Sequence, residues 1–341
     1  MRRLLALGFV TLVLVALPIA SPAFACECGG MAPPLNGEVS IAGERAIVSL
    51  KDGIQTTDLL LDVASSSTES GLIVPTPTPA TVSSGELSDF DDVERAILPR
   101  PNYEEDWWGV DTVVSAVRDE RKTIPVVAKH VKLGPLEATT LAASDSAGLQ
   151  SWLVENNFVL PSGAAELFQP YVKAGWSFVA IKLSGDGALS GTLDPVRLTF
   201  ETSELVYPVR LYQGYTEPHS VRLYVIDDNR VDVVRLTEPD AEPKPINAAQ
   251  KVIWAARLLT GEPQAGRFLT VFDIRFDSPA TQATSDIYFA KSKANDESIS
   301  IVTVVTPMTL LGVPFGTVLV GSVVLALMAL LGVFIARMRV R

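Results

Sequence analysis

An uncharged apolar run near the end of the chain most constrains its fold. Residues 309–336 contain no charged side chain, and three arginines follow within the last five residues. At about 1.5 Å of rise per residue, a helix of this length more than spans a hydrocarbon core of roughly 30 Å. Glycine and proline at its start predict that the firm helix begins nearer Phe315. We expect a transmembrane helix over 309–336 and a cytoplasmic tail, 337–341, under the positive-inside rule.

The N-terminal end has the pattern of a secretory signal peptide over residues 1–25. Arg2 and Arg3 precede an apolar stretch, and Ala23-Phe24-Ala25 offers a small-residue cleavage motif. Together the two ends predict a single-pass protein of the cytoplasmic (cell) membrane. Its N-terminal body is expected outside, and its C-terminus inside.

The net charge of the chain restricts the classes of molecule that it is expected to bind. The formal net charge is −11, and without the five arginines at the two ends 23 basic residues stand against 39 acidic ones, or −16. An acidic surface disfavours nucleic acid and anionic lipid headgroups. Besides the membrane, an envelope protein or a glycan is the expected partner. No pattern indicates an oligomeric state, and no cofactor is expected.

The body between the ends has mixed patterning in which strands dominate. Alternating apolar residues on both sides of Asp52-Gly53 predict a hairpin, and Ser88 begins a helical pattern that Pro99 stops. Two more helices are expected after Asp145 and Ser162. Further strands are predicted at 176–183, 195–200, 205–212, 221–226, 268–276, 287–290 and 299–305. The predicted fold class is therefore α+β, with a predominantly antiparallel β ectodomain, two or three short helices and one C-terminal transmembrane helix.

A proline-rich acidic stretch suggests one boundary inside the body. Residues 238–245 hold three prolines and three acids. We therefore expect a main α+β domain over 26–238 and a membrane-proximal, β-rich segment over 246–306. Residues 100–130 are charged and weakly periodic, which predicts a loop-rich excursion from the main domain.

Seven stretches of the body form one combination of motifs. The first is Cys-Glu-Cys-Gly-Gly directly after the signal, and the others lie at 71–80, 133–138, 149–161, 171–183, 193–200 and 207–211. Together they resemble a bacterial family, domain of unknown function 2330. The resemblance runs from about residue 26 to residue 228. It implies an exported protein, often with a terminal membrane helix, and it implies no activity and no catalytic residues.

Cys26 and Cys28 are the sharpest chemical feature. Residues two apart can form a strained disulfide, which is the first expectation. Two thiolates beside glycines can also bind a soft metal. Lipid attachment at Cys26 and free or intermolecular thiols complete the alternatives.

The best place for a sugar to bind is an acidic stretch with two tryptophans. Glu104 and Glu105 lie next to Trp107 and Trp108, so a ring could stack on an indole beside carboxylates. Paired carboxylates are also the groups that hydrolyse glycosides. The alternative is a solvated acidic loop with one tryptophan packed down.

Other polar residues favour structural roles. His219 lies in a Glu-Pro-His-Ser stretch and is expected at the surface in a turn, and His130, which lies between two lysines, is also expected at the surface. Lys182, Arg197 and Arg210, with Arg222, recur on successive predicted strands and would form a basic stripe if they aligned. Without such alignment they are the solvated face of a half-exposed sheet.

The sequence favours a non-enzymatic surface module that binds or scaffolds a partner outside the membrane. No known nucleophile, zinc or phosphate-loop motif occurs, and no catalytic residue is assigned. The alternatives are a cell-envelope glycan hydrolase using paired carboxylates, and thiol or metal handling by Cys26 and Cys28.

Overall fold

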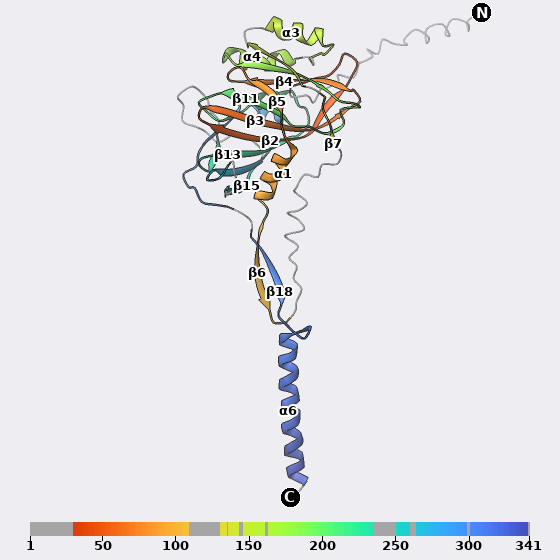
Figure 1. Cartoon of the computed structure of the whole chain (residues 1–341), viewed down its shortest axis with the longest axis vertical. Coiled ribbons are helices and arrows are strands. Elements are labelled where there is room, and N and C mark those ends of the chain that lie inside the picture. Colours follow the sequence, from red (N-terminus) through yellow and green to blue (C-terminus); the bar gives the residue numbers. More distant parts are fainter. Residues whose placement is uncertain are drawn as a thin grey trace, which may run out of the picture.

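The computed structural model describes residues 30–108, 130–134, 136–142, 146–160, 163–234, 250–259, 264–298 and 301–339. Cys26 and Cys28 lie outside these stretches. The described part forms three regions along one long axis: a β-rich body, a narrow two-stranded stalk and a C-terminal helix (Figure 1).

Strands outnumber helices throughout the body. The strands are β1 (Met31–Ala32), β2 (Val39–Lys51), β3 (Ile54–Ser65), β4 (Glu69–Thr76), β5 (Thr81–Ser84), β6 (Arg100–Asp106), β7 (His130–Val131), β8 (Glu137–Ala142), β9 (Ser177–Ser184), β10 (Gly191–Leu193), β11 (Val196–Glu201), β12 (Val206–Tyr207), β13 (His219–Asp227), β14 (Val231–Val234), β15 (Gln250–Leu258), β16 (Phe268–Phe276), β17 (Ile287–Lys291), β18 (Ile301–Pro307), β19 (Thr309–Leu310) and β20 (Val313–Pro314). The helices are α1 (Leu87–Ala96), α3 (Ser146–Glu155), α4 (Ala164–Lys173), the 3-10 helix η1 (Arg210–Gly214), α5 (Pro279–Gln282) and α6 (Phe315–Arg339). The predicted α+β class is confirmed.

The long β2–β3 hairpin lies at the centre of the largest sheet. Asp52 and Gly53 have φ of 52° and 77°, as a two-residue type I′ turn requires, so the predicted hairpin is confirmed. A nine-stranded sheet forms around it in the order β15-β16-β13-β2-β3-β10-β7, with β11 on β3 and β5 on β11. Most of its pairs are antiparallel, but β13 runs parallel to β2.

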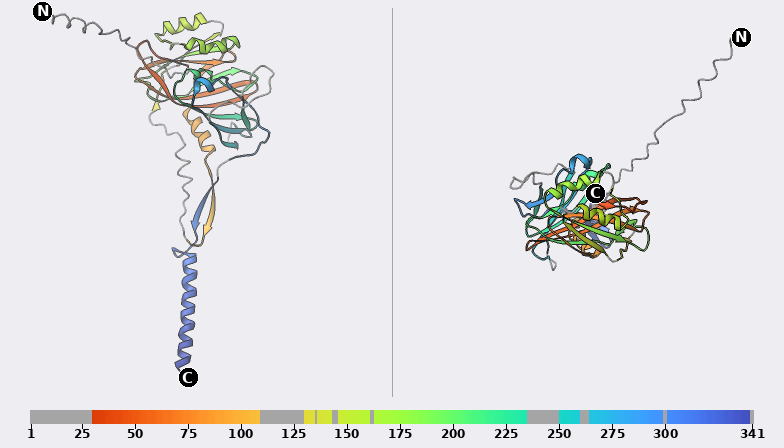
Figure 2. Two further views of the ribbon diagram at one scale, coloured as in Figure 1. Left: turned by 180° about the vertical axis from the view of Figure 1, so that it is seen from behind. Right: turned by 90° about the horizontal axis from the view of Figure 1, so that it is seen from above.

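A four-stranded antiparallel sheet, β1-β4-β9-β8, packs over one face of the large sheet. Helices α3 and α4 cover its outer face, and α1 covers part of the opposite face of the large sheet (Figure 2). Successive residues of β2 consequently face different cores: Val48 faces the four-stranded sheet, while Ile47 faces Phe90 and Val93 of α1. The body is therefore a stack of helices, sheet, sheet and helix.

The strands after the proline-rich stretch join sheets of the body. Strands β15 and β16 extend the large sheet beyond β13, and β17 pairs with β12 and β14 in a three-stranded sheet. Phe272 and Ile287 belong to the same core cluster as Val48 and Leu59 of the central hairpin. Of the described strands after that stretch, only β18, β19 and β20 lie outside the sheets of the body, in the pairs β18–β6 and β19–β20 that precede α6.

Two local predictions are wrong because contacts with residues far away in the sequence determine the conformation of these segments. Residues 100–106 form strand β6, which pairs in parallel with β18 about 200 residues later. The predicted strand 205–212 ends after β12, because the chain turns into helix η1, whose Leu211 packs into a core and whose Tyr212 is buried. The predicted helix near 88–97 is confirmed as α1.

Helix α6 begins at Phe315, as expected, and has 25 residues. It is long and apolar enough to cross a membrane. Strands β6 and β18, which we call the stalk, lead from the body to this helix (Figure 1).

Candidate functional site

The tryptophans predicted to bind a glycan lie where the stalk meets α6. Glu104 and Glu105 are exposed residues of β6, and Trp107 and Trp108 follow it with exposed fractions of 49% and 58%. The ring of Trp107 packs edge-on against Phe315 with 5.2 Å between centroids. The four residues are thus close together, and glycan binding by them stays a prediction.

The four basic residues Lys182, Arg197, Arg210 and Arg222 do not align into a stripe, so of the two alternatives the basic stripe is excluded. They lie on different sheets and on η1, and each has a carboxylate partner. The nitrogen–oxygen distances are 3.1 Å for Lys182–Glu69, 2.6 Å for Arg197–Asp58, 3.1 Å for Arg210–Asp286 and 2.6 Å for Arg222–Asp273. Neutralising partners leave no concentrated positive field for an anionic ligand at these four positions.

His219 is buried, whereas the sequence predicted a surface turn. It is the first residue of β13 and is 6% exposed. Its ring is stacked on Tyr215 at 4.3 Å and meets Tyr212 edge-on at 4.5 Å. The signal was present in the alternation of His219 with Val221 and later apolar residues, which places the imidazole on the core face.

Glu44 pairs with His219 across the parallel β2–β13 contact. The imidazole Nε2 lies 3.1 Å from Oε2 of Glu44, and the Tyr207 hydroxyl donates to the other carboxylate oxygen, Oε1. A bulge in β2 between Ile41 and Gly43 precedes Glu44, and bulges commonly redirect neighbouring side chains. Burial, and then the Glu44 carboxylate, raise the pKa of Tyr207 well above its usual value of 10.0. The phenol therefore stays protonated and remains a donor.

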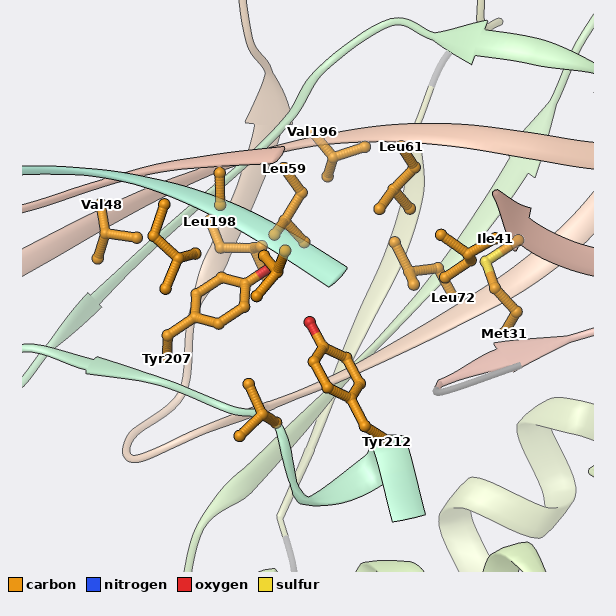
Figure 3. Close-up of a cluster of buried hydrophobic side chains, with 14 of the residues drawn as sticks. Met31, Ile41, Val48, Leu59, Leu61, Leu72, Val196, Leu198, Tyr207 and Tyr212 are labelled. Carbon is orange, nitrogen blue, oxygen red and sulfur yellow. The ribbon is translucent and has the colours of Figure 1, made fainter. Parts of the chain in front are cut away.

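The His219–Glu44 pair lies between a surface groove and an apolar interior. The groove has a volume of about 570 Å³ and is lined by both residues together with Asp62, Ser220 and Arg222. On the inner side, Glu44 borders a small cavity of about 40 Å³ with mostly apolar walls. Figure 3 shows this interior, with the hydroxyls of Tyr207 and Tyr212 among aliphatic side chains.

This arrangement can hold or pass a proton and can bind a polar ligand. An imidazole hydrogen-bonded to a carboxylate is a general acid–base unit when a substrate reaches it. The ion pair of Arg222 with Asp273 borders the same groove. Among the described residues, no group of three or more His, Cys, Asp or Glu side chains could hold a metal ion.

A second groove, of about 810 Å³, lies between α1 and the large sheet. There Arg197 bridges Asp58 of β3 and Asp89 of α1 at 2.6 Å and 2.7 Å. Burial raises the pKa of Asp58, and the hydrogen bond and charge of Arg197 oppose that rise. The bridge fastens α1 to the sheet, so its first role is structural.

Comparison with known protein families identifies the body. A family model described as an uncharacterized protein conserved in bacteria, DUF2330, matches residues 22–290. The chain belongs to the DUF2330 family. The match confirms the resemblance found in the sequence and extends it past residue 228, through β15, β16 and most of β17. It ends before the stalk strand β18 and α6, and the DUF2330 description assigns no activity.

Comparison with curated proteins finds no match. Among solved structures, the chain is similar to the crystal structure of baculovirus P35, with 7% sequence identity and a TM-score of 0.35. The similarity covers 77% of this chain and 97% of that chain. At this level it carries no argument about fold or function.

Proposed function

We propose that this DUF2330 protein is a single-pass membrane protein that displays its body outside the cell membrane as a non-enzymatic binding or scaffolding module. The observation that carries the proposal is the convergence of two distant chain segments, β6 and β18, on the first turn of one apolar helix. The arginines in the last turn of α6 and at the end of the chain support an inside C-terminus and therefore an outside body.

Protease digestion of right-side-out membrane vesicles tests the orientation. With a C-terminal epitope on the full chain, we expect external protease to remove the body and leave a protected fragment containing α6. A body that survives digestion until detergent is added would contradict the proposal.

The groove beside His219 and Glu44 is the proposed binding surface. Ser220 is exposed in this groove, whereas Ser83 of β5 is exposed elsewhere on the body. A photo-crosslinking amino acid at position 220 should give discrete envelope-protein or glycan adducts in living cells, and the same group at position 83 should not. Equal adducts at both positions, or none at 220, would contradict binding at the groove.

One observation favours an enzyme as a second candidate, namely the His219–Glu44 pair at 3.1 Å beside that groove. A glycan hydrolase with this pair as its acid–base unit would release reducing ends from cell-wall glycan. The release would be lost in Glu44→Gln, which keeps an oxygen for Tyr207. Absence of release by the intact protein would remove this candidate. The paired-carboxylate hydrolase at Glu104 and Glu105, and thiol or metal handling at Cys26 and Cys28, stay predictions from the sequence.

A further inference from the structure

The lower end of the stalk is unusually apolar for a surface exposed to water. Trp107 and Trp108 directly follow β6, and the β19–β20 hairpin comes after β18; we call these residues the foot (107–108 and 309–314). Leu311 is 98% exposed at the tip of the hairpin, and Leu310 is 49% exposed. Leu311 also has a φ of 53°, a backbone conformation that costs free energy for a branched side chain.

The foot is joined to the first turn of α6 by specific contacts. The amide of Gly316 donates to the carbonyl of Trp107 at 2.6 Å, and the amide of Met308 donates to the carbonyl of Asp106 at 2.8 Å. Gly316 is the residue that lets the chains approach, since a Cβ there would lie 2.6 Å from the Trp108 ring and 2.8 Å from the Trp107 carbonyl oxygen. The tryptophans are thus held at a fixed level relative to α6.

That level coincides with the outer edge of the membrane if α6 spans it. The 25 residues of α6 extend about 37 Å, which places the basic residues of its last turn beyond a hydrocarbon core of roughly 30 Å. Tryptophan is enriched at the headgroup level because its ring is apolar and its N–H needs a polar partner. Exposed leucines at the same level would leave water by entering the acyl boundary.

We propose that the foot is a lipid-binding surface that embeds in the headgroup region of the bilayer. The proposal rests on the membrane-spanning role proposed above for α6. It commits to zwitterionic or neutral lipid headgroups, because residues 102–108 and 306–316 contain no lysine or arginine and include Glu104, Glu105 and Asp106. Segment β6, far from α6 in sequence, thereby becomes a second point of attachment to the membrane.

Depth-dependent fluorescence quenching tests the foot on the full chain. The protein is reconstituted in phosphatidylcholine liposomes whose acyl chains carry bromine either near the headgroup or near the bilayer centre. We expect quenching by the shallow bromines to exceed quenching by the deep ones. That shallow quenching should be lost in the matched variant Trp107→Phe/Trp108→Phe, which keeps the tryptophans of the body.

Four further readings separate this proposal from its alternatives: flotation, the variant Leu311→Asp, anionic lipid and protection from iodide. Flotation of the protein together with the liposomes after alkaline extraction reports the anchoring by α6. A protein that stays behind when the liposomes float would overturn the proposed function. Flotation with equal quenching of the parent and the double variant overturns the foot alone. Leu311→Asp should reduce the quenching by shallow bromines, and the protein should still float with the liposomes. Anionic lipid should not increase the quenching by shallow bromines. An increase with anionic lipid would overturn the headgroup assignment, and protection from aqueous iodide by soluble glycan would assign the tryptophans to a sugar instead.

Discussion

Strand β2 in the body and strand β6 in the stalk show two ways of holding a strand in place. Strand β2 has neighbours on both edges and core clusters on both faces. Among the described strands, β6 pairs with β18 alone, and its first six residues are exposed. An isolated pair of strands is marginally stable in water. The difference teaches that the body stabilises itself, whereas the stalk depends on the parts of the molecule to which its two ends are fixed.

The largest expected effect comes from a buried ion pair of the body. Asp286 has no exposed surface and accepts hydrogen bonds from the Tyr171 hydroxyl at 2.7 Å and from the amides of Val209 and Arg210. Asp286→Ala leaves these donors and the Arg210 charge without their partner, so we expect a loss of about 3–5 kcal/mol in the free energy of unfolding. Urea unfolding monitored by circular dichroism measures it.

The matched control is Asp277→Ala, which removes an exposed ion pair with Arg275. It should change the free energy of unfolding by less than about 1 kcal/mol. Equal effects of the two variants would contradict the contrast between buried and exposed contacts.

A smaller loss is expected at the polar cluster beside the groove. Glu44→Ala removes the acceptor for the Tyr207 hydroxyl and the partner of His219. Each buried polar group left without a hydrogen-bond partner lowers the free energy of unfolding by about 1–3 kcal/mol. Glu44→Gln keeps an acceptor and should lose less in the same urea experiment. If Glu44→Ala unfolds like the parent protein, the cluster does not stabilise the body.

The comparison of body and stalk also shows which parts of the fold can be predicted from the sequence. The β2–β3 hairpin, helix α1 and helix α6 were predictable because their signals are local: a turn dipeptide, apolar residues at helical spacing and an uncharged run. The stalk was not, because β6 gains its conformation from β18 about 200 residues later.

The same limit applied to the candidate sites. His219 was predicted at the surface because the neighbouring Pro218 and Ser220 suggest a turn, although its alternation with Val221 pointed inward. Its partner Glu44 lies 175 residues away in the sequence. Trp107 and Trp108 were singled out from sequence, but their contact with Phe315 and Gly316 required the fold.

The pH dependence of stability should reflect the buried carboxyls of the body. Burial raises the pKa of both Asp58 and Asp286 above the usual value of 3.8. Between 3.8 and the raised values the folded chain holds more protons than the unfolded chain. This contribution to the free energy of unfolding is therefore fully present below 3.8 and is lost as pH rises through the folded-state pKa values.

Comparison with a variant that lacks the Asp286 carboxyl separates its contribution to the free energy of unfolding from that of the other carboxyls. Asp286→Asn cannot ionise, so the stability of the parent relative to this variant should fall as pH rises from about 4 to about 7. A relative stability that rises over this interval would show that the pKa of Asp286 is lowered rather than raised.

The smallest effect on the body should come from breaking the stalk. Asn102→Pro/Tyr103→Pro places proline at two neighbouring residues of β6, so at least one hydrogen bond to β18 is lost. Because these residues are exposed, the free energy of unfolding of the body should change by no more than about 0.5 kcal/mol. Hydrogen exchange should speed up in β6 and β18 and stay unchanged in the sheets of the body. Destabilisation of the body would show that the stalk belongs to its cooperative unit.

The height of the body above the membrane tests the central claim most directly. The seven residues of β6 extend about 23 Å at roughly 3.3 Å per residue. Neutron reflectometry on the full chain in a supported bilayer should therefore show a thin, water-rich layer of about this thickness between the headgroups and the dense body. Dense protein that begins directly at the headgroups would contradict a body raised on a stalk.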